Sequence, residues 1–338
     1  DLLLLFGSKR LNTIKQEKLN NQAANLDVET SENSIQESIA QIYIQILYAA
    51  ESVKVNENTL QVSIAQRDRG QELLNAGSIA KSDLAQLEAQ VSTDRYQLVT
   101  AQATLQDYKL QLKQLLELDG ENEMNVYLPA LSDENVLLPL PTKKDVYMSA
   151  LTLRPEIEAS KLSVEASELG IDIAKAGYLP TISLSAGIGT NHTSGSDFTF
   201  GEQVKNGWNN SIGVSVSVPI FNNRQTKSAV QKAKLQRETS LLSLLDEQKT
   251  LYKTIEGLWL DANSAQQRYA AANEKLRSTQ ISYDLISEQF NLGMKNTVEL
   301  LTEKNNLLQA QQEQLQAKYM AILNTQLLKF YQGDKLAL

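Results

Sequence analysis

Cysteine is absent from the chain, and histidine occurs once, as His192. Without cysteine, the sequence excludes disulfides, thiolate metal sites and cysteine nucleophiles. One histidine is too few for a histidine-based metal cluster or for a relay of several histidines. The net charge of −8 argues against a nucleic-acid-binding protein, which would carry a basic stripe. We therefore predict no catalytic residue, no metal ion and no cofactor.

Long hydrophobic runs are also absent, because no stretch approaches the roughly 18 consecutive apolar residues of a membrane-spanning helix. Residues 2–6 are apolar but lack the basic region and the small-residue cleavage site of a signal peptide. We interpret them as the severed end of an element in a mature or trimmed fragment, and residues 1–8 as the stub of a barrel strand.

Proline and glycine are scarce in two long stretches of the chain. All 6 prolines lie between Pro129 and Pro219, and residues 9–75 contain a single glycine, Gly70. At about 1.5 Å per residue, a helix of that length reaches roughly 100 Å, and residues 224–290 form a second stretch of the same length. Helices this long are typical of coiled coils or helical tubes and not of globular folds.

Apolar residues also recur every seven positions, which predicts that the helices supercoil around neighbouring helices. The first set is Leu84, Val91, Leu98, Leu105 and Leu112, with Leu87, Ala101, Tyr108 and Leu115 on the partner positions. The second set is Leu301, Leu308, Leu315 and Ile322. This pattern alone leaves a soluble antiparallel coiled coil open as an alternative.

The two halves of the chain match when the sequence is shifted by 216 positions, so that Gly77 falls on Gly293. A glycine just past a helix end supplies the left-handed conformation of a C-terminal cap. We therefore predict a duplicated half-protein with two long helical hairpins. The first covers residues 9–118 with its tip at Gly77, and the second covers residues 222–331 with its tip at Gly293.

The remaining segments connect or follow these hairpins. We expect residues 119–154 to form an irregular equatorial segment, because prolines and glycine interrupt the helical pattern there. A helix that leads to the strands is predicted over residues 155–177, starting at Pro155 and ending near Gly177. Residues 332–338 form a C-terminal tail.

Residues 178–221 change to a period of two, which predicts a β-hairpin. Its apolar positions are Ile182, Leu184, Ala186 and Ile188 in the first strand and Ile212, Val214, Val216 and Val218 in the second. Neither run carries a charge, and a length of about ten residues suits a tilted strand of a membrane barrel. A lone hairpin is marginal in water, and a barrel needs about eight strands. We therefore expect other copies to complete a barrel, and a first β-hairpin that is missing from the chain.

Three segments, Leu153–Ile157, Ala174–Leu184 and Val216–Arg224, together with the two glycine tips, carry a resemblance to a known family. In them the chain resembles TolC-type outer-membrane efflux proteins, the exit ducts of tripartite efflux and type I secretion systems. The closing stretch Leu327–Gly333 is similar to members from the Bacteroidetes branch.

The resemblance implies a mostly α-helical fold with a membrane β part, assembled as a homotrimer. Each chain would supply four strands to a twelve-stranded outer-membrane barrel, and the coiled-coil hairpins would form a periplasmic tube closed at its tips. The implied partners are a periplasmic adaptor (membrane fusion protein), an inner-membrane RND or ABC transporter and outer-membrane lipid, with no nucleic acid. The protein would be a passive duct and not an enzyme. The alternative is a soluble coiled-coil scaffold or tether without channel activity.

The resemblance also implies a periplasmic gate near the tips. Asp83 matches the acidic partner of a polar link between the hairpins, Lys295 matches its basic partner, and Phe290 stands where the family often has a tyrosine. Glu299 matches the first position of an acidic ring, which would favour cations. The plainer alternative is that both acids stabilise helix starts and that Lys295 is a solvated turn residue.

The adaptor-docking surface implied by the resemblance consists of the small or apolar residues of the two turns. These residues are Ala76, Gly77, Ser78, Ile79, Leu292, Gly293, Met294 and Lys295. Helix capping explains the two glycines in either case.

Overall fold

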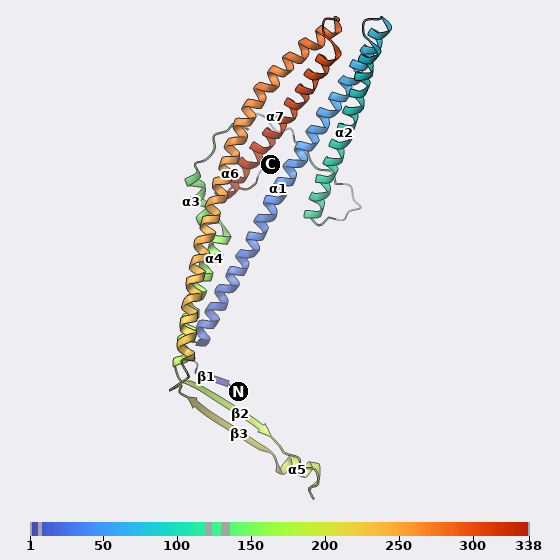
Figure 1. The fold of residues 1–338 in the computed structure, drawn as a ribbon. Coiled ribbons are helices and arrows are strands. Elements are labelled where there is room, and N and C mark those ends of the chain that lie inside the picture. The colour runs from blue at the N-terminus through green and yellow to red at the C-terminus, as the bar shows by residue number, and fades with distance from the viewer. Residues whose placement is uncertain (1, 6–8, 119–123, 130–135, 337–338) are drawn as a thin grey trace. The chain divides into compact units, whose positions relative to one another are not determined.

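The computed structural model describes residues 2–5, 9–118, 124–129 and 136–336 (Figure 1). The helices are α1 (Lys9–Asn75), α2 (Lys81–Leu115), α3 (Lys143–Leu153), α4 (Pro155–Lys175), α5 (Phe200–Asn206), α6 (Gln225–Asn291) and α7 (Thr297–Gln332). The strands are β1 (Leu2–Leu5), β2 (Thr181–Gly189) and β3 (Asn209–Ser217). The predicted fold class, long helical hairpins with a smaller β part, is confirmed. In the described part of the chain, no helix combines the length and the hydropathy needed to cross a membrane.

The chain divides into two compact units, and the division falls within α1, between α3 and α4, and within α6. One unit comprises Asp1–Thr30 and Arg154–Thr250, and we call it the strand unit. The other comprises Ser31–Leu153 and Leu251–Leu338, and we call it the helical unit.

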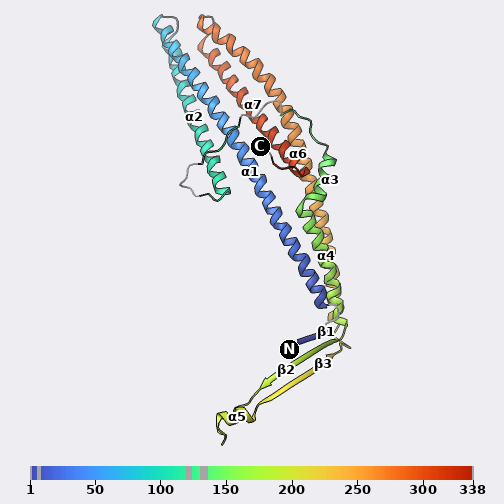
Figure 2. The same cartoon turned by 180° about the vertical axis from the view of Figure 1, so that it is seen from behind.

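In the helical unit, α2 folds back along α1 and α7 folds back along α6 (Figures 1 and 2). Near the turns, a buried apolar cluster contains Leu87 of α2, Phe290 of α6 and Leu300 of α7. Further from the turns, a second cluster joins Ile44 of α1 to Tyr319 of α7. Full burial of one such side chain contributes about 1.5–3 kcal/mol. Tertiary packing of this kind, more than helix propensity, therefore stabilises the two hairpins.

The segment that follows the first hairpin is fixed along α6. Val136 is only 1% exposed, and its carbonyl accepts a hydrogen bond from Gln266 Nε2 at 2.9 Å. Trp259 Nε1 donates to the carbonyl of Pro141 at 3.0 Å. Side chains of α6 thus satisfy backbone groups that an irregular segment cannot pair within itself.

Residues 119–154 were expected to be irregular, but they contain helix α3 over Lys143–Leu153. Thr142 precedes the helix, and its Oγ1 accepts from the Asp145 N–H at 3.2 Å. Val146 and Ala150, one turn apart, are fully buried. Pro139 and Pro141 lie just before this helix and Pro155 just after it, so the density of prolines was a poor guide to the residues between them.

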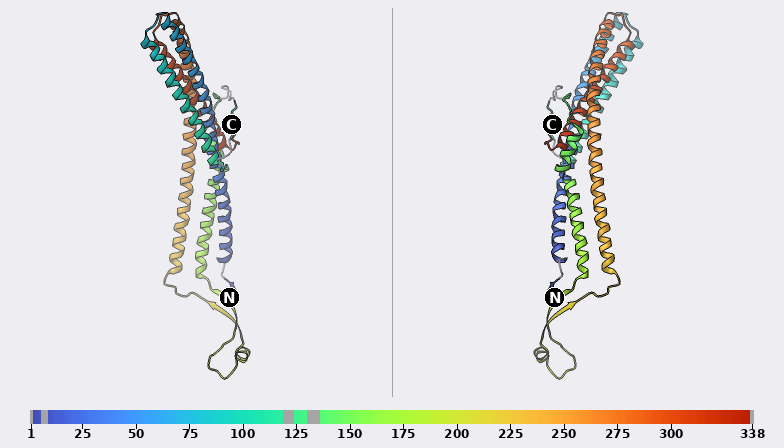
Figure 3. Two further views of the ribbon diagram at one scale, coloured as in Figure 1. Left: turned by 90° about the vertical axis from the view of Figure 1, so that its right-hand side faces the viewer. Right: turned by 90° about the vertical axis from the view of Figure 1, so that its left-hand side faces the viewer.

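In the strand unit, α4 lies between α1 and α6 (Figure 3). Gln16 Nε2 of α1 donates to the Ala166 carbonyl of α4 at 2.8 Å. Arg237 of α6 forms an ion pair with Glu168 of α4 at 2.8 Å. Polar contacts therefore join α4 to α1 on one side and to α6 on the other.

Gly177 follows α4 within a 3₁₀ turn, Ala176–Tyr178, and does not adopt the expected left-handed cap. Its carbonyl accepts from Thr226 Oγ1 of α6 at 3.3 Å. A Cβ atom at Gly177 would lie 3.0 Å from Thr226 Cγ2. Glycine at this position thus permits close approach of α6 and does not serve helix termination.

The strands form an antiparallel sheet in the order β1-β2-β3. Leu184 pairs with Val214, and Ser183 pairs with Ser215, so apolar residues oppose apolar ones and small residues oppose small ones. The predicted alternation therefore produces one apolar face and one small, polar face. Much of the apolar face is left uncovered by the described chain: Ile212, for example, is 82% exposed.

Candidate functional site

The two predicted tips end their helices with the same backbone geometry. At the first tip, Gly77 has φ = +72°, its N–H donates to the Leu74 carbonyl at 2.9 Å, and the Ser78 N–H donates to the Leu73 carbonyl at 2.8 Å. This pair of bonds defines a Schellman motif. The left-handed conformation costs a non-glycine residue about 1–2 kcal/mol, which explains glycine here.

The second tip repeats this motif at Gly293, whose φ is +75°. The Gly293 N–H donates to the Phe290 carbonyl at 2.9 Å, and the Met294 N–H donates to the Gln289 carbonyl at 2.8 Å. The duplication inferred from the sequence therefore extends to individual backbone hydrogen bonds.

The helices that follow the tips begin with equivalent acids. Asp83 Oδ2 accepts from the Ala80 N–H at 3.0 Å, and Glu299 Oε2 accepts from the Asn296 N–H at 3.2 Å. Asn296 Oδ1 also accepts from the Glu299 N–H at 2.9 Å, which completes a capping box at the second tip. Both acids therefore cap helices in this chain, whatever further role they have.

Lys295 lies beside Glu299 and not beside Asp83. Its Nζ is 2.5 Å from Glu299 Oε1. Two hydrogen bonds hold the pKa of the Glu299 carboxyl below its ordinary value. The one from Lys295 has the larger effect, and the one from the Asn296 N–H has the smaller. The structure thus joins two of the predicted gate residues, and the link between Asp83 and Lys295 stays a prediction for the assembled protein.

Phe290 is 3% exposed and packs against Leu87 and Leu300 next to the tips. It anchors the second hairpin through apolar contact. Two helical turns away on α6, the Tyr283 hydroxyl accepts from Gln66 Nε2 of α1 at 2.9 Å. This polar link between the hairpins was not found from the sequence.

The predicted docking residues lie on the surface of the turns. Leu292 and Met294 are each 69% exposed. Ala76, Gly77, Ser78 and Gly293 are exposed as well, whereas Ile79 and Lys295 are half-buried. Exposed apolar side chains on both sides of the tip glycine are suited to contact with a partner, because that contact would remove them from water.

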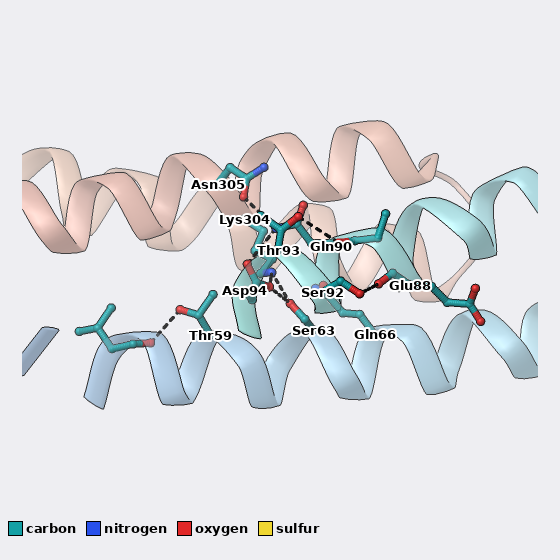
Figure 4. Close-up of polar contacts among 12 residues, drawn as sticks. Thr59, Ser63, Gln66, Glu88, Gln90, Ser92, Thr93, Asp94, Lys304 and Asn305 are labelled. Carbon is teal, nitrogen blue, oxygen red and sulfur yellow. Dashed lines mark hydrogen bonds and ion pairs between the residues drawn. The ribbon is translucent and has the colours of Figure 1, made fainter. Parts of the chain in front are cut away.

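The two most buried charged side chains of the described chain were missed by the sequence analysis. Asp94 of α2 is 1% exposed, and Lys304 of α7 is 3% exposed (Figure 4). Lys304 Nζ forms an ion pair with Asp94 and donates to Ser63 Oγ of α1, and Ser63 Oγ donates to Asp94. Gln90 Nε2 donates to the other Asp94 oxygen at 2.9 Å. We call Ser63, Asp94 and Lys304 the buried triad.

The heptad pattern contained a signal for this triad. Asp94 stands seven residues after Leu87 and seven before Ala101, on a partner position that the apolar set skips. A polar residue at such a position specifies how helices pair, at a cost in stability. Burial lowers the pKa of the Lys304 ammonium, and the hydrogen bond and charge of Asp94 oppose that shift.

Comparison with known proteins identifies similar sequences along most of the chain. The profile of the family described as outer membrane efflux protein matches residues 146–333. The outer membrane efflux protein BepC of Brucella suis biovar 1 is 25% identical over 294 residues, which cover 86% of this chain and 61% of BepC. The outer membrane protein TolC of Escherichia coli K12 is 25% identical over 311 residues, which cover 88% of this chain and 60% of TolC. The chain thus spans about 60% of the length of these relatives.

Solved structures show the same fold at lower sequence identity. A structure of CusC aligns with a TM-score of 0.83 and 19% identity, covering 97% of this chain and 75% of CusC. The CmeC outer membrane channel of Campylobacter jejuni aligns with a TM-score of 0.80 and 19% identity, covering 99% of this chain and 70% of CmeC.

Proposed function

Because the chain belongs to the outer membrane efflux protein family, we propose that it is part of the outer-membrane exit duct of a tripartite export system. Proteins of this family are channels and not enzymes, and they are located in the outer membrane with a periplasmic extension. In our proposal three copies form a passive channel. An inner-membrane RND or ABC transporter delivers the cargo to this channel through a periplasmic adaptor.

The apolar face of β2 and β3 is the observation that carries this proposal. Val214 and Val216 are 65% and 62% exposed, and no charged residue lies in either strand. Strands of a membrane barrel direct apolar residues to lipid and small or polar residues to the lumen. Open sheet edges are not stable in lipid, so a further strand must pair with the free edge of β3.

We assign the gate to Asp83, Lys295, Glu299 and Phe290. Glu299 carboxylates from three copies would form a negative ring that favours cations. The ion pair with Lys295 partly neutralises this ring in the resting arrangement. The exposure of Lys295 supports a movable lysine, because its side chain is one-third exposed in the turn.

The solution mass of the full-length protein, measured by light scattering in mild detergent, tests the assembly. Three chains per particle, followed by single-channel conductance in planar bilayers, would support the duct. A monomer or dimer that does not depend on detergent would contradict it and would leave the soluble coiled-coil scaffold as the better interpretation.

We assign adaptor docking to the two tips, residues 76–79 and 292–295, and Gly293→Asp tests this assignment. Aspartate tolerates a positive φ better than most residues, and a Cβ atom at Gly293 meets nothing within 4 Å. The substitution therefore adds charge without a clash, and we expect loss of export with an intact trimer. Export is measured as the growth of cells on a toxic cargo that the wild-type protein lets them tolerate.

Gly293→Asn is the matched control, because asparagine has the same shape and the same tolerance of positive φ without the charge. We expect this variant to retain export. Loss of the trimer in Gly293→Asp, or equal loss of export in both variants, would mean that the tip is structural and not a docking surface.

A further inference from the structure

The buried triad lies between two apolar clusters that both join the hairpins of one chain. On the side of the tips are Leu87 and Leu300, and on the far side are Ile44 and Tyr319. The apolar side chains of these clusters are buried without help from a charged group, and the gate assigned above does not include the triad. The triad therefore has a role other than packing.

The triad fixes the two hairpins in one register. Ser63 and Asp94 belong to the first hairpin, and Lys304 belongs to the second (Figure 4). A slip of α7 by one residue moves a side chain by about 1.5 Å along the axis and about 100° around it. Such a slip would leave Lys304 and Asp94 buried without each other, which is strongly unfavourable. The neighbouring apolar contacts discriminate much less between registers, because they are not directional.

The triad is not repeated at the equivalent positions of the duplicated chain. A shift of 216 positions takes Ser63, Asp94 and Lys304 to the counterparts Thr279, Ala310 and Glu88. These counterparts cannot form the same cluster, because one of them is an apolar residue and the only charge is the exposed carboxylate of Glu88. Thr279 Oγ1 instead donates to the Lys275 carbonyl of its own helix at 2.6 Å.

In a ring of three copies, first and second hairpins alternate, so every second contact between hairpins joins two copies. The triad occupies the contact within a copy, and its counterparts occupy the equivalent contact between copies. The two kinds of contact therefore differ in a buried charged interaction that is specific for register.

We propose that Ser63, Asp94 and Lys304 are positioning residues of the gate. They form a latch that keeps the two hairpins of one copy in register and thereby helps to keep the tips closed. This inference rests on the proposed function, since it assumes the trimeric ring.

Lys304→Met in the full-length protein is the first test. The variant leaves Asp94 buried without its partner, and we expect a severalfold rise in resting single-channel conductance and in the sensitivity of cells to vancomycin. Lys275→Met is the matched control, because Lys275 also pairs between helices, with Glu313 at 2.7 Å, but is 44% exposed. The control should leave both readouts unchanged. Unchanged conductance in Lys304→Met trimers would overturn the proposal.

Asp94→Leu combined with Lys304→Met separates register from stability. Apolar replacement of both charges removes the buried-charge penalty, so the trimer should melt no lower than the wild type. We nevertheless expect this double variant to leak, because apolar side chains do not specify register. A double variant that seals as tightly as the wild type would overturn the proposal.

A cross-link within one copy supplies the decisive rescue. Gln90 Nε2 of α2 donates to Asn305 Oδ1 of α7 at 3.4 Å, and the sequence contains no cysteine. In the triple variant Gln90→Cys, Lys304→Met, Asn305→Cys, a short bismaleimide should restore low resting conductance, because it replaces the latch. Persistent leakage after complete cross-linking would overturn the proposal. A wild-type protein that forms no trimer or channel would instead contradict the proposed function.

Discussion

Glu117 occupies a backbone position that its counterpart in the second half fills with glycine. Glu117 follows α2 with φ = +51°, and Gly333, 216 positions later, follows α7 with φ = +107°. The N–H groups of both residues donate to the carbonyl three positions earlier, at 3.1 Å. The two hairpins therefore have the same backbone motif at their ends as well as at their tips. Glu117 adopts the left-handed conformation although it lacks the conformational freedom of glycine.

Glu117→Gly should raise the free energy of unfolding by about 0.5–1 kcal/mol. Relief of about 1–2 kcal/mol of left-handed strain exceeds the entropy that glycine adds to the unfolded chain. The midpoint of thermal unfolding in detergent checks this expectation. Glu117→Ala removes the charge but keeps the Cβ atom, so an equal gain in that variant would assign the effect to charge and not to φ.

Glu299 gives a pH dependence at the same scale. Its pKa is lowered from 4.5, chiefly by Lys295, so the charge and its stabilising contacts are present above pH 4.5 and are lost as the pH falls through the lowered pKa. We expect the cation selectivity of the channel, measured by reversal potential, to persist below pH 4.5. Lys295→Met should move the loss of selectivity to higher pH. An unchanged midpoint in this variant would remove Lys295 as the cause.

At the scale of elements, two glycines of the hairpins have opposite reasons to be glycine. Gly293 has a positive φ and open space around it, whereas Gly70 lies inside α1, where a Cβ atom would be 2.4 Å from Leu87 Cδ1. Position 293 requires glycine because of its backbone conformation. Position 70 requires glycine because α2 approaches α1 closely there.

Gly293→Ala should cost about 1–2 kcal/mol, from backbone strain alone. Gly70→Ala should cost about 1–3 kcal/mol from overpacking, against a gain of about 0.8–1.0 kcal/mol in helix propensity. Leu87→Val should rescue Gly70→Ala and should not rescue Gly293→Ala, as judged by thermal unfolding. Equal behaviour of the two alanine variants toward Leu87→Val would contradict this assignment.

The elements that the sequence predicted best are those with a long, uninterrupted period. The hairpins and the strand alternation extend over many residues, so one exception such as Asp94 did not hide them. Helix α3 was missed because it is short and follows a run of prolines. The triad was missed because Asp94 and Lys304 are 210 residues apart, and nothing local shows that two polar residues on different helices will meet.

At the scale of the whole molecule, the two units differ in what they bury. Among the residues that the structure describes, the helical unit contains apolar clusters and the triad, whereas every residue of β3 is exposed in the single chain. Backbone hydrogen bonds without buried side chains around them open easily. The strands should therefore be locally less stable than the helical unit until the copies assemble.

Amide hydrogen exchange of the full-length protein tests this difference. In dissociated chains we expect β2 and β3 to exchange within seconds to minutes, while α7 near Leu315 and Tyr319 is protected for much longer. On assembly in detergent, the strands should gain most of the new protection. Strands that are already protected in a single chain would contradict a sheet that depends on other copies.

The uncovered face and edge of β3 have a consequence for the life of the protein in the cell envelope. In the described sheet β3 pairs with β2 alone. A copy without partners therefore presents an unpaired backbone edge and an exposed apolar face to its surroundings. Such an edge is a ready target for chaperones and proteases, and a nucleus for aggregation. A copy without partners thus exposes, in its own sheet, a feature that chaperones and proteases recognise.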